Sequence, residues 1–402
     1  NGSIEILDDP VKETLTEKIN EMSDKALRVL GIAYKNTADI ENNAENDLIF
    51  TGLVGIIDPP KENVDKSIAA CKKAGIKVRM ITGDHLKTAS AIAREIGILT
   101  DGKVIDGETL DKLSDEEYFE IVDDIQVYAR VKPEQKMRIV ETLKQKGEIV
   151  SMTGDGVNDA PALKNASIGV AMGSGTDVAK ESGDMIIQDD NFETIVTAIR
   201  EGRKIYDNIK RFVKFQVSTN VGAILTIVGT SIFMLPVPFN PVQLLWINIV
   251  MDGPPAQTLG MEGSERNIMT RQPETGDILN KKVLIKIFIA GLVMAIGSIA
   301  LFSYKLAIGA SQKQAMTVAF TLFVMYQLFN AYNSKSNSDK KSTYLYLAII
   351  ACFILQILIV YIPELQLIFR TTSIGITDWI LIFIIAATIL VSNKIANKIV
   401  VE

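Results

Sequence analysis

The strongest constraint on the fold is a series of apolar runs in the second half of the sequence. Six runs can be counted, and they span residues 212–235, 241–260, 283–305, 315–333, 344–362 and 375–393. A helix needs roughly 20 apolar residues to cross the hydrocarbon core of a bilayer, and a spanning helix satisfies its own backbone hydrogen bonds. These runs therefore predict a bundle of six transmembrane helices that follows an N-terminal half without such runs.

Basic residues gather in the connections on one side of the predicted bundle. They precede the first run, separate the second from the third and the fourth from the fifth, and follow the sixth: Arg203, Lys204, Lys210, Arg211, Lys214, Arg266, Arg271, Lys281, Lys282, Lys335, Lys340, Lys341, Lys394 and Lys398. The opposite connections carry only Lys313 and Arg370. By the positive-inside rule, this asymmetry predicts that the N-terminal half and the C-terminus face the cytoplasm.

Composition limits the classes of partner. The formal net charge of -6, without a basic stripe in the first half, argues against a nucleic-acid partner. The two cysteines, Cys71 and Cys352, lie in different halves, so we expect neither a disulfide framework nor a thiolate metal cluster. Because the sequence opens in mid-pattern at NGSIEILDD without an initiator methionine, we expect residues upstream of it.

Strand and helix patterns alternate in the N-terminal half. KVRMITGD at 77–84 is typical of a buried strand and lies between two helical patterns, VDKSIAACKKAG and AIAREIGIL, and a later helix, MRIVETLKQKG, precedes the strand EIVSM. This alternation predicts a doubly wound parallel sheet, whose ligands gather at the carboxyl ends of the strands. The residues expected around that crevice are Thr82, Gly83, Asp84, Asp155 and Asp159.

The residue types at these strand ends suit phosphoryl transfer. Carboxylates can hold Mg²⁺, a hydroxyl and backbone amides can bind phosphate oxygens, and Lys136 can neutralise charge. Gly154 and Gly156 of TGDGVNDAPAL let the backbone approach closely, although GDG alone is more often a turn. GSGTD at 173–177 fits a helix cap as well as a phosphate loop, and the single histidine, His85, fits a surface position better than a ligand.

A few polar residues interrupt the apolar runs. They are Asn220, Asn248, Asp252, Gln327 and Asn330. Spacing by four residues predicts that Asn248 and Asp252 share one helix face, and the GPP that follows opens the helix. A carboxylate beside an opened helix at membrane depth indicates a cation site, whereas the amides alone could equally bond neighbouring helices.

Several motifs together resemble the hinge and phosphorylation domain of cation-transporting P-type ATPases. They are TGDGVNDAPAL, MITGD, DPPKENV and KPEQK; VQLLWINIVMDG and QLFNAYNS resemble the sixth and eighth spans of calcium pumps, and KALRVLGIAYK resembles the end of their nucleotide-binding domain. The resemblance implies a Rossmann-like α/β haloacid-dehalogenase-like phosphorylation domain followed by an α-helical transmembrane bundle. Residues 1–50 would end the nucleotide-binding domain, 51–200 would form the phosphorylation domain, and 201–402 would supply family spans five to ten.

The resemblance also implies roles for individual residues. Asp155 would bind the catalytic Mg²⁺, Asn158 and Asp159 would support the phosphate site, and Thr82 and Gly83 would contact the phosphoryl group. Lys136 would balance the phosphate charge, Asp84 and Arg130 would face the nucleotide, and Arg28 would touch ATP. No DKTGT or TGES occurs, so we expect the chain to be the C-terminal part of a longer pump whose remainder supplies the phosphorylated aspartate.

The pattern of residues in the spans bears on the transported ion. Two-site calcium pumps have Glu, Thr and Glu where this chain has Ala223, Met251 and Gln327, which predicts one Ca²⁺ per cycle. This pattern resembles plasma-membrane calcium pumps, so we expect a plasma-membrane protein, with H⁺ as the candidate counter-ion. The expected ligands of the transported cation are Asn220, Asn248, Asp252 and Gln327.

Three alternatives stay open from the sequence. One Asp and one Asn do not define selectivity, so the pump could move Mn²⁺, Mg²⁺, Na⁺ or H⁺ instead. A membrane-anchored phosphatase of the same fold would act independently of Asp252, and a regulatory or channel-like subunit would not act on phosphate at all. If the chain is a pump, ion binding near Asp252 should order the first two spans, and residues 203–214 should carry the change to the phosphorylation domain.

Overall fold

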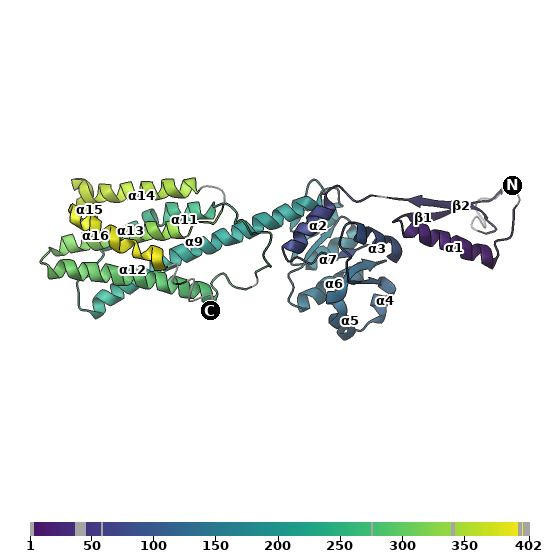
Figure 1. Ribbon diagram of the computed structural model, residues 1–402, viewed down its shortest axis with the longest axis horizontal. Coiled ribbons are helices and arrows are strands. Elements are labelled where there is room, and N and C mark those ends of the chain that lie inside the picture. The colour runs from purple at the N-terminus through teal and green to yellow at the C-terminus, as the bar shows by residue number, and fades with distance from the viewer. Residues whose placement is uncertain are drawn as a thin grey trace. The chain divides into compact units, whose positions relative to one another are not determined.

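The computed structural model describes residues 4–36, 46–57, 59–274, 276–338, 342–392 and 396 (Figure 1). The chain divides into two units, one of Asn1–Ile199 with Met269–Pro273 and the other of Arg200–Ile268 with Glu274–Glu402. Asp58 of the DPPKENV motif and four of the predicted cytoplasmic lysines, Lys340, Lys341, Lys394 and Lys398, lie outside the described residues.

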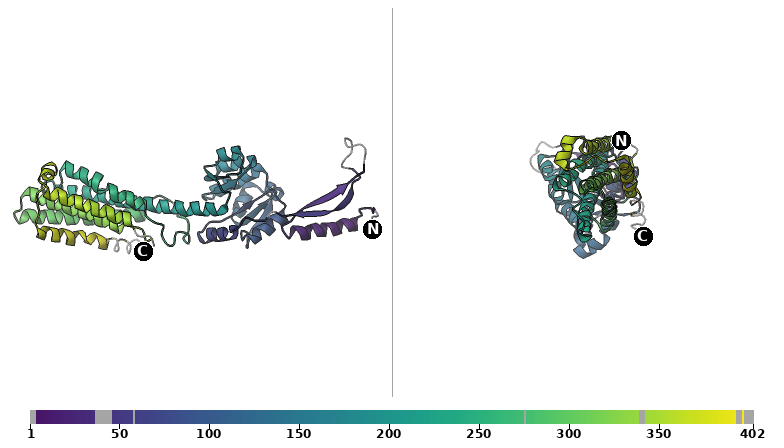
Figure 2. Two further views of the ribbon diagram at one scale, coloured as in Figure 1. Left: turned by 90° about the horizontal axis from the view of Figure 1, so that it is seen from above. Right: turned by 90° about the vertical axis from the view of Figure 1, so that its left-hand side faces the viewer.

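Two three-stranded parallel sheets form the core of the first unit. Their strand orders are β3-β5-β4 and β6-β7-β8, with bounds β3 (Met80–Ile81), β4 (Lys103–Asp106), β5 (Ile125–Ala129), β6 (Ser151–Gly154), β7 (Ile168–Met172) and β8 (Met185–Ile187). A separate antiparallel pair joins β1 (Arg28–Tyr34) to β2 (Ile49–Ile56), and α1 (Asp9–Ser23) lies beside it (Figure 2).

Helices surround the parallel strands of this unit. They are α2 (Val64–Lys73), α3 (Leu86–Glu95), α4 (Gly107–Lys112), α5 (Asp115–Ile121), α6 (Pro133–Gln145), α7 (Ala160–Asn165) and α8 (Asp177–Ser182), with short turns η1 (Val122–Asp124) and η2 (Val157–Asp159). Strand β5 is buried on both faces, because Val127 and Ala129 join one hydrophobic cluster and Tyr128 joins another. A strand apolar on both faces is what a parallel sheet covered by helices requires, and the predicted α/β class is confirmed.

One predicted strand is much shorter than its pattern suggested. KVRMITGD was expected to form a buried strand that ends in a Thr-Gly-Asp turn, but the strand β3 holds only Met80 and Ile81. The preceding Arg79 turns its guanidinium toward the carbonyls of Val122 and Ile125 instead of pairing its backbone in the sheet. The parallel ladder with β5 therefore begins only at Met80, which pairs with Val127.

Apolar helices make up the second unit. They are α9 (Phe192–Ile232), of which Arg200 onward belongs here, α10 (Pro241–Leu245), the π-helical turn η3 (Trp246–Met251), α11 (Gly253–Gly260), α12 (Lys281–Ala307), α13 (Gln312–Asn333), α14 (Thr343–Tyr361), α15 (Pro363–Phe369) and α16 (Ile376–Ala386). Four of the described helices, α9, α12, α13 and α14, are long and apolar enough to cross a membrane. The second predicted span is interrupted by η3, and the sixth is a shorter apolar helix, Ile376–Ser392.

Helix α13 occupies the centre of this bundle. In its most apolar stretch 83% of the residues are buried, compared with 33% in each of the other three long helices, and it packs against α12, α14 and α16 (Figure 1). Its buried side chains include the polar Gln327 and Asn330. Polar groups at the centre of an apolar bundle are costly unless they find partners, so these two residues mark the region to inspect for function.

A buried ion pair joins the ends of α12 and α16. The Lys305 ammonium contacts the Asp378 carboxylate, and only 9% and 4% of the two side chains are exposed. Removing one partner of a buried pair leaves an uncompensated charge, whereas replacing both by apolar residues is often tolerated.

We expect Lys305→Met to lower the free energy of unfolding of the detergent-solubilised protein by about 3 kcal/mol, because the Asp378 carboxylate would be left buried without its ion-pair partner. The double variant Lys305→Met, Asp378→Leu should recover most of the loss. Thermal unfolding midpoints compare the three proteins. A single variant as stable as the wild type would show that the pair contributes nothing.

Candidate functional site

The loops that follow β3 and β5 are bonded to each other at one edge of the sheet. The Thr82 amide donates to the Tyr128 carbonyl at 2.9 Å, the Val131 amide donates to the Thr82 carbonyl at 3.2 Å, and the Arg130 amide donates to the Asp84 carbonyl at 3.1 Å. Gly83, between them, is exposed with open space around its α-carbon. The predicted residues Thr82, Gly83, Asp84 and Arg130 are thus held together by backbone bonds.

Asp159 organises the loop that follows β6. Its Oδ2 accepts hydrogen bonds from the amides of Asp155 (3.3 Å) and Gly156 (3.2 Å), and its Oδ1 lies 2.6 Å from the Lys136 Nζ. Asp159 is 6% exposed, so this carboxylate is committed to the fold of the loop. The Asp155 carboxylate is exposed, and no bond joins it to any other described residue. Of the two acidic groups, Asp155 is therefore the one available to an ion.

Two glycines permit the close packing of this loop. A β-carbon on Gly154 would collide with the Asp159 side chain, and one on Gly175 would lie 2.8 Å from the Asp155 carbonyl oxygen. Gly156 is different, because a β-carbon there would be 3.7 Å from its nearest neighbour, an ordinary contact. The prediction for Gly154 fits this geometry, but the second close approach belongs to Gly175 and not to Gly156. Space around Gly156 is open because its amide, not its α-carbon, faces Asp159.

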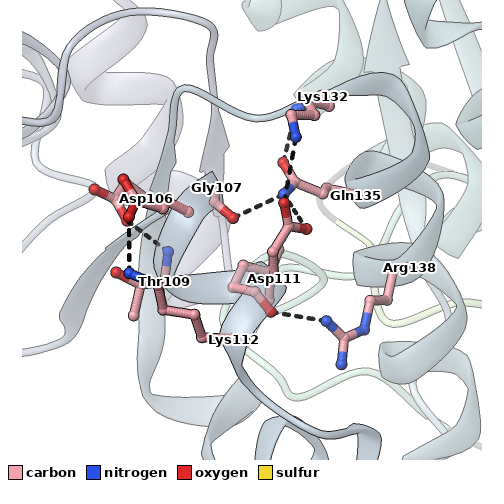
Figure 3. Close-up of polar contacts among 10 residues, drawn as sticks. Asp106, Gly107, Thr109, Asp111, Lys112, Lys132, Gln135 and Arg138 are labelled. Atoms are coloured by element: carbon pink, nitrogen blue, oxygen red, sulfur yellow. Dashed lines mark hydrogen bonds and ion pairs between the residues drawn. The ribbon is translucent and has the colours of Figure 1, made fainter.

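Gln135 anchors the beginning of the helix that carries Lys136. Its Nε2 donates to the Gly107 carbonyl at 2.7 Å and to Asp111 at 2.5 Å, while its Oε1 accepts from the Lys132 amide at 2.8 Å (Figure 3). The Gln135 amide holds the pKa of the Asp111 carboxyl below its usual value. The sequence analysis did not identify Gln135. The feature that could have indicated it is a Gln three residues after Lys132, the capping-box spacing at the start of α6.

The remaining predicted residues of the first unit have varied settings. Ile81 at the end of β3 packs against the cluster that contains Met152 of β6, so these two strands contact one hydrophobic cluster although they belong to different sheets. Asn158 is exposed, and Arg28 is exposed on β1, away from these strand ends in sequence and element. His85 is exposed as expected and caps α3. In GSGTD the cap of α8 is Thr176, whereas the Ser174 amide bonds Asp190.

In the second unit, Asp252 and Gln327 form a buried polar pair. Gln327 Nε2 donates to Asp252 Oδ1 at 2.8 Å, and the two residues are 0% and 1% exposed, respectively. Among the described residues Gln327 Oε1 has no donor, so the pair presents one unused oxygen to its surroundings. An apolar setting with two oxygen-bearing groups is suited to a hard cation.

Asn220 and Asn248 are not part of this buried pair. Both are exposed, so Asn248 and Asp252 have different surroundings despite their spacing of four residues. The spacing argument assumed a regular helix, whereas Asn248 lies within the turn η3, which ends just before Asp252 and is wider than an α-helical turn. The Asn330 amide bonds a neighbouring helix, because its Nδ2 donates to the Ser218 hydroxyl of α9 at 2.9 Å.

The widened turn before Asp252 follows from the prolines. Pro254 has no N–H, so the Val250 carbonyl has no α-helical donor, and the Asp252 amide bonds the Ile247 carbonyl five residues back at 3.0 Å. The Cys352 thiol of α14 donates to the Val250 carbonyl, with sulfur and oxygen 3.7 Å apart. The helix therefore widens into a π turn before it restarts at Gly253, and Cys352 has a more specific contact than simple packing.

Comparisons with known proteins agree with the two units. A family model described as "Cation transporting ATPase, C-terminus" matches residues 236–399, and one described as "haloacid dehalogenase-like hydrolase" matches residues 14–167. The chain is 39% identical to a calcium-transporting ATPase of Bacillus subtilis, over 98% of this chain and 47% of that protein. It is 40% identical to calcium-transporting ATPase 1 of Saccharomyces cerevisiae (97% and 43%) and 37% identical to human calcium-transporting ATPase type 2C member 1 (96% and 43%). The chain thus spans less than half the length of these relatives.

We expect Gly154→Ala to destabilise the protein by about 1–3 kcal/mol, because its new methyl group must displace the Asp159 side chain. Gly156→Ala, two residues away in the same loop, is the matched control and should cost less than about 1 kcal/mol. Thermal unfolding of the full chain in detergent measures both. Equal effects of the two substitutions would show that the fold of this loop does not depend on the contact at Gly154.

Proposed function

Because the chain belongs to the cation-transporting P-type ATPases, we propose that it supplies the phosphoryl-handling and ion-binding residues of an ATP-driven pump that exports Ca²⁺ from the cytosol. The observation that carries the proposal is the Asp252–Gln327 pair, buried in an apolar bundle with an unused oxygen. A carboxylate in that setting has little structural use, whereas a transporter needs one.

The transported ion would bind at Asp252 and Gln327. Asn220 and Asn248, which are exposed and lie outside this buried pair, stay proposed as further ligands. Ca²⁺ takes six to eight oxygens, so water, backbone carbonyls or further spans would complete the shell. Ala223 and Met251 are buried in the apolar core of the bundle, where neither offers a hard oxygen ligand from its side chain. A single Ca²⁺ per cycle is therefore the stoichiometry that we propose, with H⁺ as the counter-ion.

The phosphoryl group would be handled at the loops after β3 and β6. Asp155 fits a Mg²⁺ ligand, because its carboxylate is exposed and its backbone is held by the Thr176 amide at 2.8 Å. Bound Mg²⁺ would neutralise charge on phosphoryl oxygens. Thr82 and Gly83 would contact the phosphoryl group, and Lys136, held in place by Asp159, has two further N–H groups to offer it.

The other proposed partners complete the reaction. Asn158 would support the phosphate site, and Asp84, Arg130 and Arg28 would lie on the ATP side. The remainder of the pump would supply the aspartate whose carboxylate accepts the γ-phosphoryl group of ATP, with release of ADP. Water would then hydrolyse the aspartyl-phosphate to aspartate and inorganic phosphate. The excess of lysine and arginine on one side of the bundle supports a cytoplasmic first unit. We also propose that the protein lies in the plasma membrane.

Hydrogen bonds within the second unit support a link between the ion site and the basic part of α9. Asn208 Nδ2 donates to the carbonyls of Gly260 and Glu262, both at 3.0 Å, and Arg211 bonds Glu265 at 2.5 Å. These acceptors lie at the end of α11 and just after it, the helix that begins beside Asp252. Movement at Asp252 would therefore reach residues 203–214 directly, as the proposed coupling requires.

We expect Asp252→Asn to abolish the Ca²⁺ dependence of phosphorylation from ATP, because it removes the charge while keeping an acceptor for Gln327. Phosphorylation of the full-length protein in membranes is measured against free Ca²⁺, with Mn²⁺, Na⁺ and pH series in parallel. Gln356→Leu is the control, since its amide bonds Thr321, about 9 Å along α13 from Gln327. An unchanged Ca²⁺ dependence in Asp252→Asn would rule out the proposed site, and a response to another cation alone would reassign the cargo.

Asp155→Ala should block phosphorylation at every ion concentration, by at least about 100-fold, because the proposed Mg²⁺ ligand is lost. Asp101→Ala, which removes another exposed carboxylate of the same unit, should leave phosphorylation unchanged. Wild-type phosphoenzyme levels in Asp155→Ala would mean that Asp155 does not hold the metal. Phosphatase activity that ignores Asp252 would instead favour an anchored phosphatase.

A further inference from the structure

The first turn of α6 carries two neighbouring side chains that bond the loops of two different sheets. Gln135 Nε2 donates to the carbonyl of Gly107, which directly follows β4 of the sheet β3-β5-β4. Lys136 Nζ bonds Asp159, which lies in the loop after β6 of the sheet β6-β7-β8. The beginning of α6 is therefore fixed to both sheets of the first unit.

The Gln135 amide uses both of its donors and is buried. One N–H of Nε2 donates to the Gly107 carbonyl at 2.7 Å and the other to Asp111 at 2.5 Å, while Oε1 accepts from the Lys132 amide at 2.8 Å (Figure 3). Gln135 is 4% exposed. Turning the amide over would set its N–H groups against the Lys132 N–H and its oxygen against the Gly107 carbonyl. The side chain therefore has one orientation.

Close packing around Gly107 limits how far Gln135 can shift. A β-carbon on Gly107 would lie 2.5 Å from the Arg130 carbonyl oxygen and 2.6 Å from Gln135 Oε1. Arg130 has a φ of 49°, a left-handed conformation that is uncommon for residues other than glycine, and its amide donates to the Asp84 carbonyl at 3.1 Å. The loop between β5 and α6 is thus held on both sides, and so is the Lys132 amide that bonds Gln135.

The first turn of α6 is held differently from the rest of the helix. Its later turns pack through the apolar side chains of Ile139, Val140 and Leu143. Its first turn is joined to the sheets by the bonds of Gln135 and Lys136. A lysine side chain is a flexible four-carbon stem, so the ammonium has a defined position only if its backbone has one. The bond from Gln135 to Gly107 supplies that position for Lys136.

We propose that Gln135 is a positioning residue for phosphoryl transfer, which sets the place of the Lys136 ammonium by fixing the first turn of α6 to Gly107. Gln135 itself touches neither the phosphoryl group nor the nucleotide. This inference rests on the proposed function, in which Lys136 balances charge on the phosphoryl oxygens. Charge balance of that kind acts on the group being transferred, so its loss slows the chemical step more than it weakens the binding of ATP.

The test measures the rate of phosphorylation of the full-length protein in membranes over a series of ATP concentrations. Gln135→Met keeps the length of the side chain and removes its three hydrogen bonds. We expect it to slow phosphorylation at saturating ATP by about 10-fold to 100-fold, because a small misplacement of a charge-balancing group is costly. The ATP concentration at half saturation should stay close to that of the wild type.

Gln126→Met is the matched control and should phosphorylate as the wild type does. The Gln126 amide likewise accepts from two backbone amides, those of Thr100 at 2.9 Å and Gly102 at 3.3 Å. These bonds lie at the beginning of β5, about 13 Å along the strand from Arg130. The control therefore removes a similar set of bonds from the same unit, away from Lys136.

A double variant separates positioning from a general loss of stability. Lys136→Met alone should slow phosphorylation by about 100-fold or more. Adding Gln135→Met to it should slow the reaction no further, because residues that act through one another are not additive. Gln135→Glu keeps the acceptor for the Lys132 amide and loses the donor to Gly107, so it should also slow phosphorylation and serves as the test if Gln135→Met does not fold.

Wild-type rates in both Gln135 variants, together with a slow Lys136→Met, would overturn the positioning role and leave the proposed function intact. Effects that multiply in the double variant would overturn it as well, and so would an equal loss of rate in Gln126→Met. A wild-type rate in Lys136→Met would contradict the proposed role of Lys136 and would remove the basis of this inference with it.

Discussion

The arrangement of the second unit depends on the cost of leaving polar groups without partners inside an apolar bundle. Two successive prolines remove two backbone donors beside Asp252, and the backbone responds by widening into η3. Gln327 of the central helix α13 then meets the carboxylate, and Cys352 of α14 meets the freed Val250 carbonyl. Three helices are thus fitted around one irregular turn, and the candidate ion site is the place where their polar groups converge.

The same principle shapes the first unit, where the donors come from the backbone. Asp159 collects two amides and the Lys136 ammonium, and this fixes the loop while the Asp155 carboxylate stays exposed. The two acidic residues of this motif therefore have different roles: Asp159 holds the loop, and the Asp155 carboxylate is exposed. The division explains why TGDGVNDAPAL is more than a turn with two negative charges.

Patterns that are local in sequence predicted much of this molecule. The apolar runs, the alternation of strands and helices, and the surface position of His85 follow from periodicity and capping signals. What failed depended on contacts that are distant in sequence. Asn220 and Asn248 are exposed because no other described helix packs over their side of the bundle. The close approach at Gly175 is to the backbone of Asp155, 20 residues earlier. Gln135 was overlooked because its role lies in bonds to α4.

The thiol that meets Val250 has a consequence for how the irregular turn can respond to its surroundings. Sulfur is a weak hydrogen-bond donor, so releasing this carbonyl from Cys352 requires far less free energy than releasing one from a backbone amide. The Val250 carbonyl oxygen, two residues before Asp252, is therefore held by a weaker donor than a backbone amide. Rotation of the Cys352 side chain alone would free this oxygen for another partner, without unwinding any helix.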